Sequence, residues 1–367
     1  MSRQRVFTII SIIAVITLLI SACTAKTNPT ATLPPTATLP PTATAVIIST
    51  AAPTNTPEPT LPPAPTATSE PTEPPEPPAT LEPTPVPATL TFTDGLERRI
   101  TLAGPAQRVV SLAPSNTEIL FYIGAGAQTV GRDEFSDYPA EAKNLPTIGG
   151  SWGGYNLEEI VALKPDLVLA AEINTPEQVQ ALADLGLTVY YLANPVTLPE
   201  MYGNLEIIAR MTGHEVETAV QIESLKARVL AVVENVKRTA ADDRPLVYYE
   251  LDATDPNAPF TFGAGTFLDA LITVAGGRNI GSSLDTAWAQ ISAEKVIELN
   301  PIIILLGDAA YGTTPESVAE RPGWSVIDAV KNSNIYPFDD NLVSRPGPRL
   351  VDGLEALVKI IHPELYR

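Results

Sequence analysis

A single cysteine, Cys23, occurs among the 367 residues of this chain. No disulfide can form within the chain, and zinc sites that need several thiolates are excluded as well. Histidine is nearly as scarce, since His214 and His362 are the only two. A zinc or manganese centre held by several imidazoles therefore cannot form. We expect a protein without a bound metal or other cofactor.

Basic residues are outnumbered by acidic ones, 23 to 42, and the formal net charge is −19. Binding of nucleic acid depends on a basic surface that faces the phosphates, so we exclude a nucleic acid as a partner. The same imbalance disfavours binding to an anionic membrane surface by charge. Any attachment to a membrane is then expected to come from a lipid.

The first 22 residues have the features of an export signal. Two arginines precede an apolar run at residues 6–20, and two small residues stand directly before Cys23. The run is shorter than the about 20 residues of a membrane-spanning helix, and small residues before a cysteine favour cleavage there. We predict a signal peptide at residues 1–22, lipid attachment at Cys23, and a location outside the cytoplasm on the outer face of a bacterial membrane.

Residues 23–88 are rich in proline, threonine, alanine and glutamate, and contain about half of the chain's 37 prolines. Proline removes backbone donors and fixes φ, so this composition cannot form a packed core. We predict an extended tether, with a tract that binds a proline-recognising partner as the alternative. The remaining chain, about 280 residues, is long enough for more than one hydrophobic core.

Strand and helix patterns alternate along this remaining part. Residues 89–93 and 99–102 favour a β-hairpin around Asp94-Gly95. Ser115 and Glu118 are spaced as a capping box that would open a helix reaching residue 123. Further strands are predicted at 108–112, 167–171, 188–192, 246–251, 302–306 and 335–338, and helices at 157–163, 176–185, 266–275, 293–299 and 349–361. Such alternation indicates parallel sheets covered by helices on both faces.

One long amphipathic segment divides this pattern into two halves. Its apolar residues recur in three- and four-residue steps, the spacing of one helix face. They are Ile222, Leu225, Val229, Val232 and Val236. We therefore predict an α/β protein with two lobes of mainly parallel sheet joined by one long α-helix. The predicted ranges are 89–213 for the N-terminal lobe, 214–240 for the helix and 241–367 for the C-terminal lobe.

A tryptophan and a glutamate recur at the same offset in the two halves. Trp152 and Glu158 in the first half match Trp288 and Glu294 in the second. Each glutamate falls in the first turn of a predicted helix, where the helix dipole favours an acid, so capping alone would explain either one. Capping does not require the paired tryptophan. We infer that each lobe presents a tryptophan to a ligand and a glutamate to basic groups of a symmetric partner.

One motif in the chain points to catalysis. Residues 149–153 match the G-x-S-x-G pattern of serine hydrolases, with Ser151 as nucleophile and His362 downstream. A nucleophile elbow needs a buried strand before the serine, whereas residues 144–148 are short and interrupted by proline. We therefore expect a binding protein and not an enzyme, with a serine hydrolase as the minor alternative.

Four segments resemble a known family. They are residues 108–118 (Arg-Val-Val-Ser-Leu-Ala-Pro-Ser-Asn-Thr-Glu), 136–139 (Ser-Asp-Tyr-Pro), 156–168 (Asn-Leu-Glu-Glu-Ile-Val-Ala-Leu-Lys-Pro-Asp-Leu-Val) and 276–280 (Gly-Gly-Arg-Asn-Ile). They are similar to class III periplasmic binding proteins, whose rigid interdomain helix joins two lobes and which serve ABC importers of vitamin B12, ferric siderophores and haem. The resemblance covers about residue 90 to the C-terminus and is strongest to the members that bind vitamin B12.

The resemblance implies roles for individual residues. Glu158 and Glu294 are implied to dock on arginines of a permease dimer, with this protein acting as a monomer. The residues implied to face a ligand in the cleft are Phe135, Trp152, Phe260, Trp288 and Arg345.

Two classes of ligand fit this resemblance. A corrinoid presents a large, mostly apolar ring edged with amides, which aromatic side chains suit. Iron chelates are anionic or polar and usually need several arginines, for which Arg132, Arg321, Arg345 and Arg349 are candidates. We predict a solute-binding lipoprotein that captures a corrinoid and delivers it to a permease, with a ferric siderophore or haem as the alternative ligand.

Overall fold

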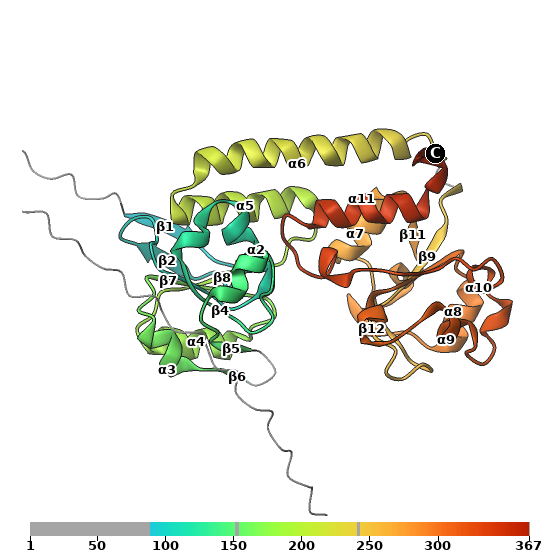
Figure 1. The fold of residues 1–367 in the computed structure, drawn as a ribbon, viewed down its shortest axis with the longest axis horizontal. Helices are drawn as coiled ribbons and strands as arrows, with labels where there is room; N and C mark the ends of the chain where they lie inside the picture. The colour runs from blue at the N-terminus through green and yellow to red at the C-terminus, as the bar shows by residue number, and fades with distance from the viewer. Residues whose placement is uncertain (1–88, 151–153, 241–242, 367) are drawn as a thin grey trace, which may run out of the picture. The chain divides into compact units, whose positions relative to one another are not determined.

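The computed structural model describes residues 89–150, 154–240 and 243–366, which lie in one compact unit that begins at Leu81. This unit contains two four-stranded sheets of parallel strands (Figure 1). We call the sheet within residues 109–192 and its helices the N-terminal lobe, and the sheet within residues 246–337 and its helices the C-terminal lobe. The predicted signal peptide, tether and lipid-attachment residue Cys23 lie outside the described residues.

The N-terminal sheet has the strand order β4-β3-β7-β8. Its strands are β3 (Val109–Ser111), β4 (Thr129–Arg132), β7 (Leu167–Ala171) and β8 (Val189–Leu192). The helices between these strands are α2 (Pro114–Tyr122), α3 (Leu157–Ala162) and α4 (Pro176–Asp184).

The C-terminal sheet has the order β11-β9-β13-β14. Its strands are β9 (Leu246–Glu250), β11 (Arg278–Asn279), β13 (Ile303–Leu306) and β14 (Ile335–Pro337). Its helices are α7 (Phe267–Val274), α8 (Ala293–Leu299), α9 (Pro315–Ala319), α10 (Asp328–Lys331) and α11 (Leu350–Ile361). An antiparallel ribbon of β10 (Phe260–Phe262) and β12 (Trp288–Gln290) accompanies this sheet.

Both faces of the central strands are buried, which explains why these strands are continuous apolar runs. Along β7, Leu167 and Leu169 pack in one core cluster with residues of α2 and α5 (Leu198–Thr212). Val168 and Ala170 point to the other face and pack in a second cluster with residues of α3 and α4. The predicted α/β fold, with two lobes of mainly parallel sheet, is confirmed.

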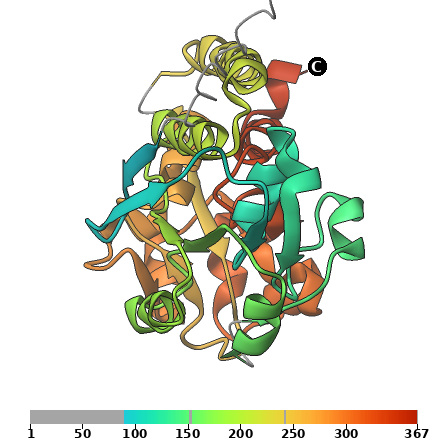
Figure 2. The same cartoon turned by 90° about the vertical axis from the view of Figure 1, so that its left-hand side faces the viewer.

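The long helix predicted at 214–240 is α6 (Glu215–Val236), which lies along α5 and α11 (Figures 1 and 2). Its buried residues Ile222 and Val236 belong to the same core cluster as Val109 of the N-terminal sheet and Val247 of the C-terminal sheet. One continuous apolar core therefore reaches both lobes. Separating the lobes would expose part of this core at a cost of about 25 cal/mol per Å², so we expect modest lobe motion. The predicted domain boundaries stay predictions.

The N-terminal hairpin pairs β1 (Leu90–Thr93) with β2 (Arg99–Leu102), as predicted, but its loop is not a two-residue turn. The Asp94 carboxylate accepts hydrogen bonds from the backbone N–H groups of Leu96 and Arg98 and from the Arg98 guanidinium. Burial acts to raise the pKa of Asp94, but these bonds outweigh it and hold the pKa below its usual value. Asp94 thus organises the wider loop.

The predicted capping box at Ser115 and Glu118 is wrong. Helix α2 begins at Pro114, its N-cap is Ala113, and no side chain caps it. Proline suits the first helical position because it has no backbone N–H to leave unsatisfied. Glu118 is thereby placed one turn inside the helix, where its side chain is buried. Its carboxylate is available for contacts distant in the sequence.

Within the part of the chain that the structure describes, no helix is both long enough and apolar enough to cross a membrane.

Candidate functional site

Ligands of parallel α/β sheets bind outside the carboxyl ends of the strands, because the connecting loops gather there. In the N-terminal lobe the loop after β4 places Phe135 and Tyr138 at this edge, and both rings are exposed. In the C-terminal lobe the segment after β13 places an almost fully exposed Tyr311 at the corresponding edge. Large apolar side chains left in solvent at such an edge indicate a binding surface.

The antiparallel ribbon of the C-terminal lobe presents two further aromatic side chains. Phe260 is 46 % exposed and Trp288 is 51 % exposed, although Phe262, which pairs with Trp288 in the ribbon, is buried. The Trp288 ring meets the Phe267 ring edge-on, with 6.0 Å between the ring centroids. One side of Trp288 is therefore supported by packing, and the other is free to stack on a flat ligand.

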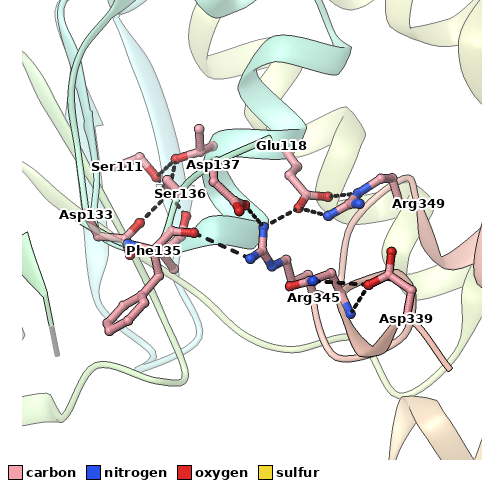
Figure 3. A network of polar contacts seen from close by, with 12 residues as sticks. Ser111, Glu118, Asp133, Phe135, Ser136, Asp137, Asp339, Arg345 and Arg349 are labelled. Carbon is pink, nitrogen blue, oxygen red and sulfur yellow. Dashed lines mark hydrogen bonds and ion pairs between the residues drawn. The ribbon is translucent and has the colours of Figure 1, made fainter. Parts of the chain in front are cut away.

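The loop that carries Phe135 is held from inside by a buried polar chain (Figure 3). Asp133 accepts a hydrogen bond from the Phe135 backbone N–H at 2.9 Å and another from the Ser136 hydroxyl. The Thr117 hydroxyl lies 2.8 Å from the hydroxyls of both Ser136 and Ser111. Burial raises the pKa of Asp133, against the lowering effect of its hydrogen bonds. The backbone of Phe135 is thus fixed while its ring stays exposed.

Two arginines of the C-terminal lobe meet one glutamate of the N-terminal lobe (Figure 3). Glu118 on α2 accepts hydrogen bonds from Arg345 Nη1 at 3.1 Å and from Arg349 Nε at 2.8 Å and Nη2 at 2.5 Å. Arg345 Nη1 also donates to Asp137 at 2.7 Å, and its Nη2 donates to the Phe135 carbonyl oxygen. Arg345 thus lies beside Phe135, and the roles of both residues toward a ligand stay predictions.

The four arginines considered for an anionic ligand do not converge on a free surface. Arg321 makes a two-pronged ion pair with Glu250, with Nη1–Oε2 and Nη2–Oε1 distances of 2.5 and 2.8 Å. Arg132 donates to backbone carbonyl oxygens, including that of Ala142. Since Arg345 and Arg349 are paired with carboxylates, all four guanidinium groups already have acceptors within the chain.

Glu158 and Glu294 lie in equivalent positions of the two lobes. Each is an exposed residue in the first turn of a short helix, α3 or α8, and each helix has the predicted side-chain cap, Asn156 or Ser292. Neither carboxylate has a hydrogen-bond or ion-pair partner among the described residues. In Figure 1, α3 and α8 both lie on the side of the unit away from α6. Their role in docking stays a prediction.

Trp152 and Ser151 lie outside the described residues, so the first tryptophan of the duplication and the hydrolase nucleophile are not placed. The partner that a hydrolase would need is engaged elsewhere. His362 is buried at the end of α11, where Nε2 lies 3.1 Å from the Gly276 carbonyl oxygen and Nδ1 lies 2.9 Å from Glu364. This arrangement joins the end of α11 to the segment before β11.

A polar hollow of about 400 Å³ that the sequence did not reveal lies at the carboxyl ends of β9 and β13. Asp252, Asp308 and Tyr311 are among its lining residues. Two other hollows, of about 380 and 250 Å³, lie beneath α6 and include none of the predicted ligand-facing residues, and Glu118 and Arg349 are among the residues that line the smaller one. Within the described ranges no group of three or more potential metal ligands occurs. In the sequence, Tyr311 could have been recognised as a tyrosine that follows shortly after a predicted buried strand.

The chain matches known proteins in sequence and in fold. Residues 109–342 match the family described as periplasmic binding protein. The chain is 32 % identical to an uncharacterized ABC transporter substrate-binding lipoprotein of Bacillus subtilis, over 76 % of this chain and 87 % of that one. It is 31 % identical to a vitamin B12-binding protein of Pectobacterium atrosepticum, over 67 % and 85 % of the two chains. A solved structure of a periplasmic heme-binding protein of Roseiflexus sp. RS-1 is similar, with a TM-score of 0.63, 26 % identity, and coverage of 71 % and 99 %.

Proposed function

The chain belongs to the periplasmic binding protein family, whose members are solute-binding proteins and not enzymes, and we propose that it captures a corrinoid for an ABC importer. In this proposal the ligand lies between the two lobes at the carboxyl edges of their sheets. The loaded protein then delivers the corrinoid to a permease dimer. The hydrolase alternative is set aside, because family membership accounts for the fold without catalysis.

The observation that supports a corrinoid is the set of exposed aromatic side chains. Phe135 of the N-terminal lobe and Phe260 and Trp288 of the C-terminal lobe are each between 41 and 51 % exposed. Such side chains suit a broad apolar ring, whose edge amides need hydrogen-bond partners and no paired charge. The relative from Pectobacterium atrosepticum is named as a vitamin B12-binding protein, in agreement with this ligand class.

Truncation of Trp288 tests this site. Stacking on a flat ligand contributes about 1–3 kcal/mol, so Trp288→Ala should weaken cyanocobalamin binding by roughly ten- to hundredfold. Because about half of the ring is already exposed, the melting temperature of the free protein should change little. Isothermal titration calorimetry measures the affinity, and circular dichroism measures the melting temperature. The same result is expected for Trp152→Ala.

Tyr366→Ala is the matched control, because Tyr366 is another partly exposed aromatic residue but lies at the C-terminal end of the chain. Its removal should leave affinity unchanged. The Trp288→Ala variant could instead bind cyanocobalamin with the affinity of the unaltered protein and melt at a much lower temperature. This result would show that Trp288 has a purely structural role.

The same cleft serves a ferric siderophore or haem in the second proposal. The observation in its favour is that the similar solved structure is named as a heme-binding protein. Against it stands the engagement of Arg132, Arg321 and Arg345 with acceptors inside the chain. Titration with haemin beside cyanocobalamin distinguishes the two ligands.

We also propose that Cys23 carries the lipid that holds the protein on the outer face of the membrane. The relative from Bacillus subtilis is named as a lipoprotein, in agreement with this anchor. Cys23→Ser should move the protein from the membrane pellet to the soluble fraction, with unchanged ligand affinity, since the tether separates the anchor from the lobes. Immunoblotting of fractionated cells measures this. A variant that stays in the pellet would contradict the anchor.

A further inference from the structure

We infer that Glu118 determines the charge specificity of the proposed cleft, because it offsets one of the two positive charges of Arg345 and Arg349 and so weakens the binding of ligands with carboxylates at this position. The inference rests on the proposed function for the position of the ligand. It concerns a residue that the sequence pattern assigned to helix capping.

The contacts join the two lobes. Glu118 lies on α2 of the N-terminal lobe, and both arginines lie between β14 and α11 of the C-terminal lobe. Arg349 uses two nitrogens on the Glu118 carboxylate, and Arg345 uses one. The Arg349 guanidinium carbon also lies 4.1 Å from the centroid of the Tyr138 ring. Charge-assisted bonds of this kind fix direction as well as distance.

The two carboxylates that contact Arg345 differ in how far they are buried. The Glu118 side chain is 1 % exposed, whereas the Asp137 side chain is 50 % exposed. The Asp137 side chain can turn into solvent, so its negative charge need not stay beside Arg345. Glu118 has no such escape, because it is enclosed within the protein. The buried residue, and not the exposed one, therefore determines how much positive charge a ligand meets.

The direct ion pairs in this cluster involve two groups of each sign. Two guanidinium groups, Arg345 and Arg349, are matched by the carboxylates of Glu118 and Asp137. Replacing Glu118 by glutamine keeps the size of the side chain but removes the buried partner of Arg345 and the only ion-pair partner that Arg349 has in the part of the chain that the structure describes. In a site with little solvent an arginine charge attracts anions more strongly than it would in water. A ligand carboxylate should then bind more tightly than it does to the unaltered protein.

The cluster lies beside a residue predicted to face the ligand. Arg345 Nη2 donates to the carbonyl oxygen of Phe135, whose ring is exposed at the edge of the N-terminal sheet. Without the Glu118 charge, Arg345 keeps only the exposed Asp137 as an ion-pair partner within the described ranges, and this guanidinium lies within one residue of the proposed binding surface. If Glu118 is purely structural, its replacement should change the affinities for amide and carboxylate ligands equally. If Glu118 determines specificity, its replacement should change the ratio of the two affinities.

The test compares two corrinoids that share a ring and differ in edge charge. Dicyanocobinamide carries amides at the ring edge, and dicyanocobyrinic acid carries carboxylates. We expect the unaltered protein to bind dicyanocobinamide at least tenfold more tightly. Glu118→Gln should lower this ratio about tenfold by strengthening carboxylate binding, with the affinity for dicyanocobinamide unchanged within about threefold. Titration calorimetry on the full-length chain in detergent measures the dissociation constants of both corrinoids.

Two further variants separate charge from packing. Glu118→Gln combined with Arg349→Met removes one charge of each sign and should restore the ratio of the unaltered protein. Glu355→Gln is the matched control, because Glu355 also accepts two hydrogen bonds from one arginine, Arg228, but lies on α11 facing α6. The ratio of the two corrinoid affinities should be the same in Glu355→Gln as in the unaltered protein. If Glu118→Gln does not fold, Arg349→Met alone should weaken carboxylate binding at least threefold.

An unchanged ratio in Glu118→Gln, or a double variant that behaves like the single one, would overturn the inference. If the unaltered protein binds neither corrinoid, the proposed ligand is wrong, and the inference is judged with haemin, which has two carboxylates. Glu118→Gln should then bind haemin at least fivefold more tightly than the unaltered protein. Equal affinity of the two proteins for haemin would overturn the inference separately from the proposed ligand.

Discussion

Reversing both helix-terminal glutamates, Glu158→Lys together with Glu294→Lys, is expected to abolish uptake while ligand affinity in solution changes by less than about threefold. Both carboxylates are exposed and have no partner among the described residues, so their replacement costs no contact within the chain. Each lies on a helix away from α6, at equivalent places in the two lobes (Figure 1). A symmetric permease dimer would offer two matching basic groups to such a pair.

Uptake of labelled cyanocobalamin by cells that lack this gene, complemented with each variant, measures the effect. The matched control is Glu215→Lys with Glu217→Lys, because these exposed acids also occupy the first turn of a helix, α6, and give the same change of charge. This control should support normal uptake. If the Glu158 and Glu294 double variant instead loses ligand affinity and retains uptake, the two glutamates belong to the binding site and the docking proposal is wrong.

Arg321→Met is expected to lower the free energy of unfolding by about 3–5 kcal/mol, the usual effect of leaving one member of a buried ion pair alone. The Glu250 side chain is fully buried and the Arg321 side chain is 10 % exposed. Arg321 also stacks on the buried ring of Trp324, with its guanidinium carbon 4.7 Å from the ring centroid. Without Arg321, the Tyr248 hydroxyl, 3.2 Å away, is the remaining side-chain donor to the Glu250 carboxylate among the described residues. Denaturant titration followed by circular dichroism measures the change.

The loss should depend on pH in a defined direction. Burial raises the pKa of Glu250 above its ordinary value of 4.5, and Arg321 opposes that rise. Without Arg321 the folded-state pKa rises further, so the folded protein takes up a proton that the unfolded chain has released. The destabilisation should therefore be small below about pH 4.5 and grow as pH rises toward the folded-state pKa.

Arg228→Met is the control for the Arg321 variant. Arg228 forms ion pairs with Asp352 and Glu355, but all three side chains are at least a third exposed. Ion pairs in contact with solvent contribute about 0–1 kcal/mol, so this variant should remain close to the unaltered protein in stability. Equal losses for Arg321→Met and Arg228→Met would show that burial of Glu250 does not govern the result.

Local patterns predicted the elements of the fold well. The strand at 167–171 coincides with β7, and the caps Asn156 and Ser292 accept the hydrogen bonds expected of them. These features depend on residues close in the sequence, where side-chain periodicity and capping act directly on the backbone. The hairpin shows the limit of this approach, because the Asp94 side chain reorganised a loop that the Asp-Gly pair alone favoured as a tight turn.

The sequence by itself determined the two-lobed α/β architecture, the long helix and the matched positions of Glu158 and Glu294, since each follows from periodicity or repetition along the chain. Only the tertiary structure decided which charges neutralise each other. Glu118 meets Arg345 across 227 residues of sequence, and Glu250 meets Arg321 across 71. A charged side chain carries no mark of its partner in its local pattern, because the folded backbone alone brings distant segments together. The availability of the arginines to a ligand was therefore a property of the fold.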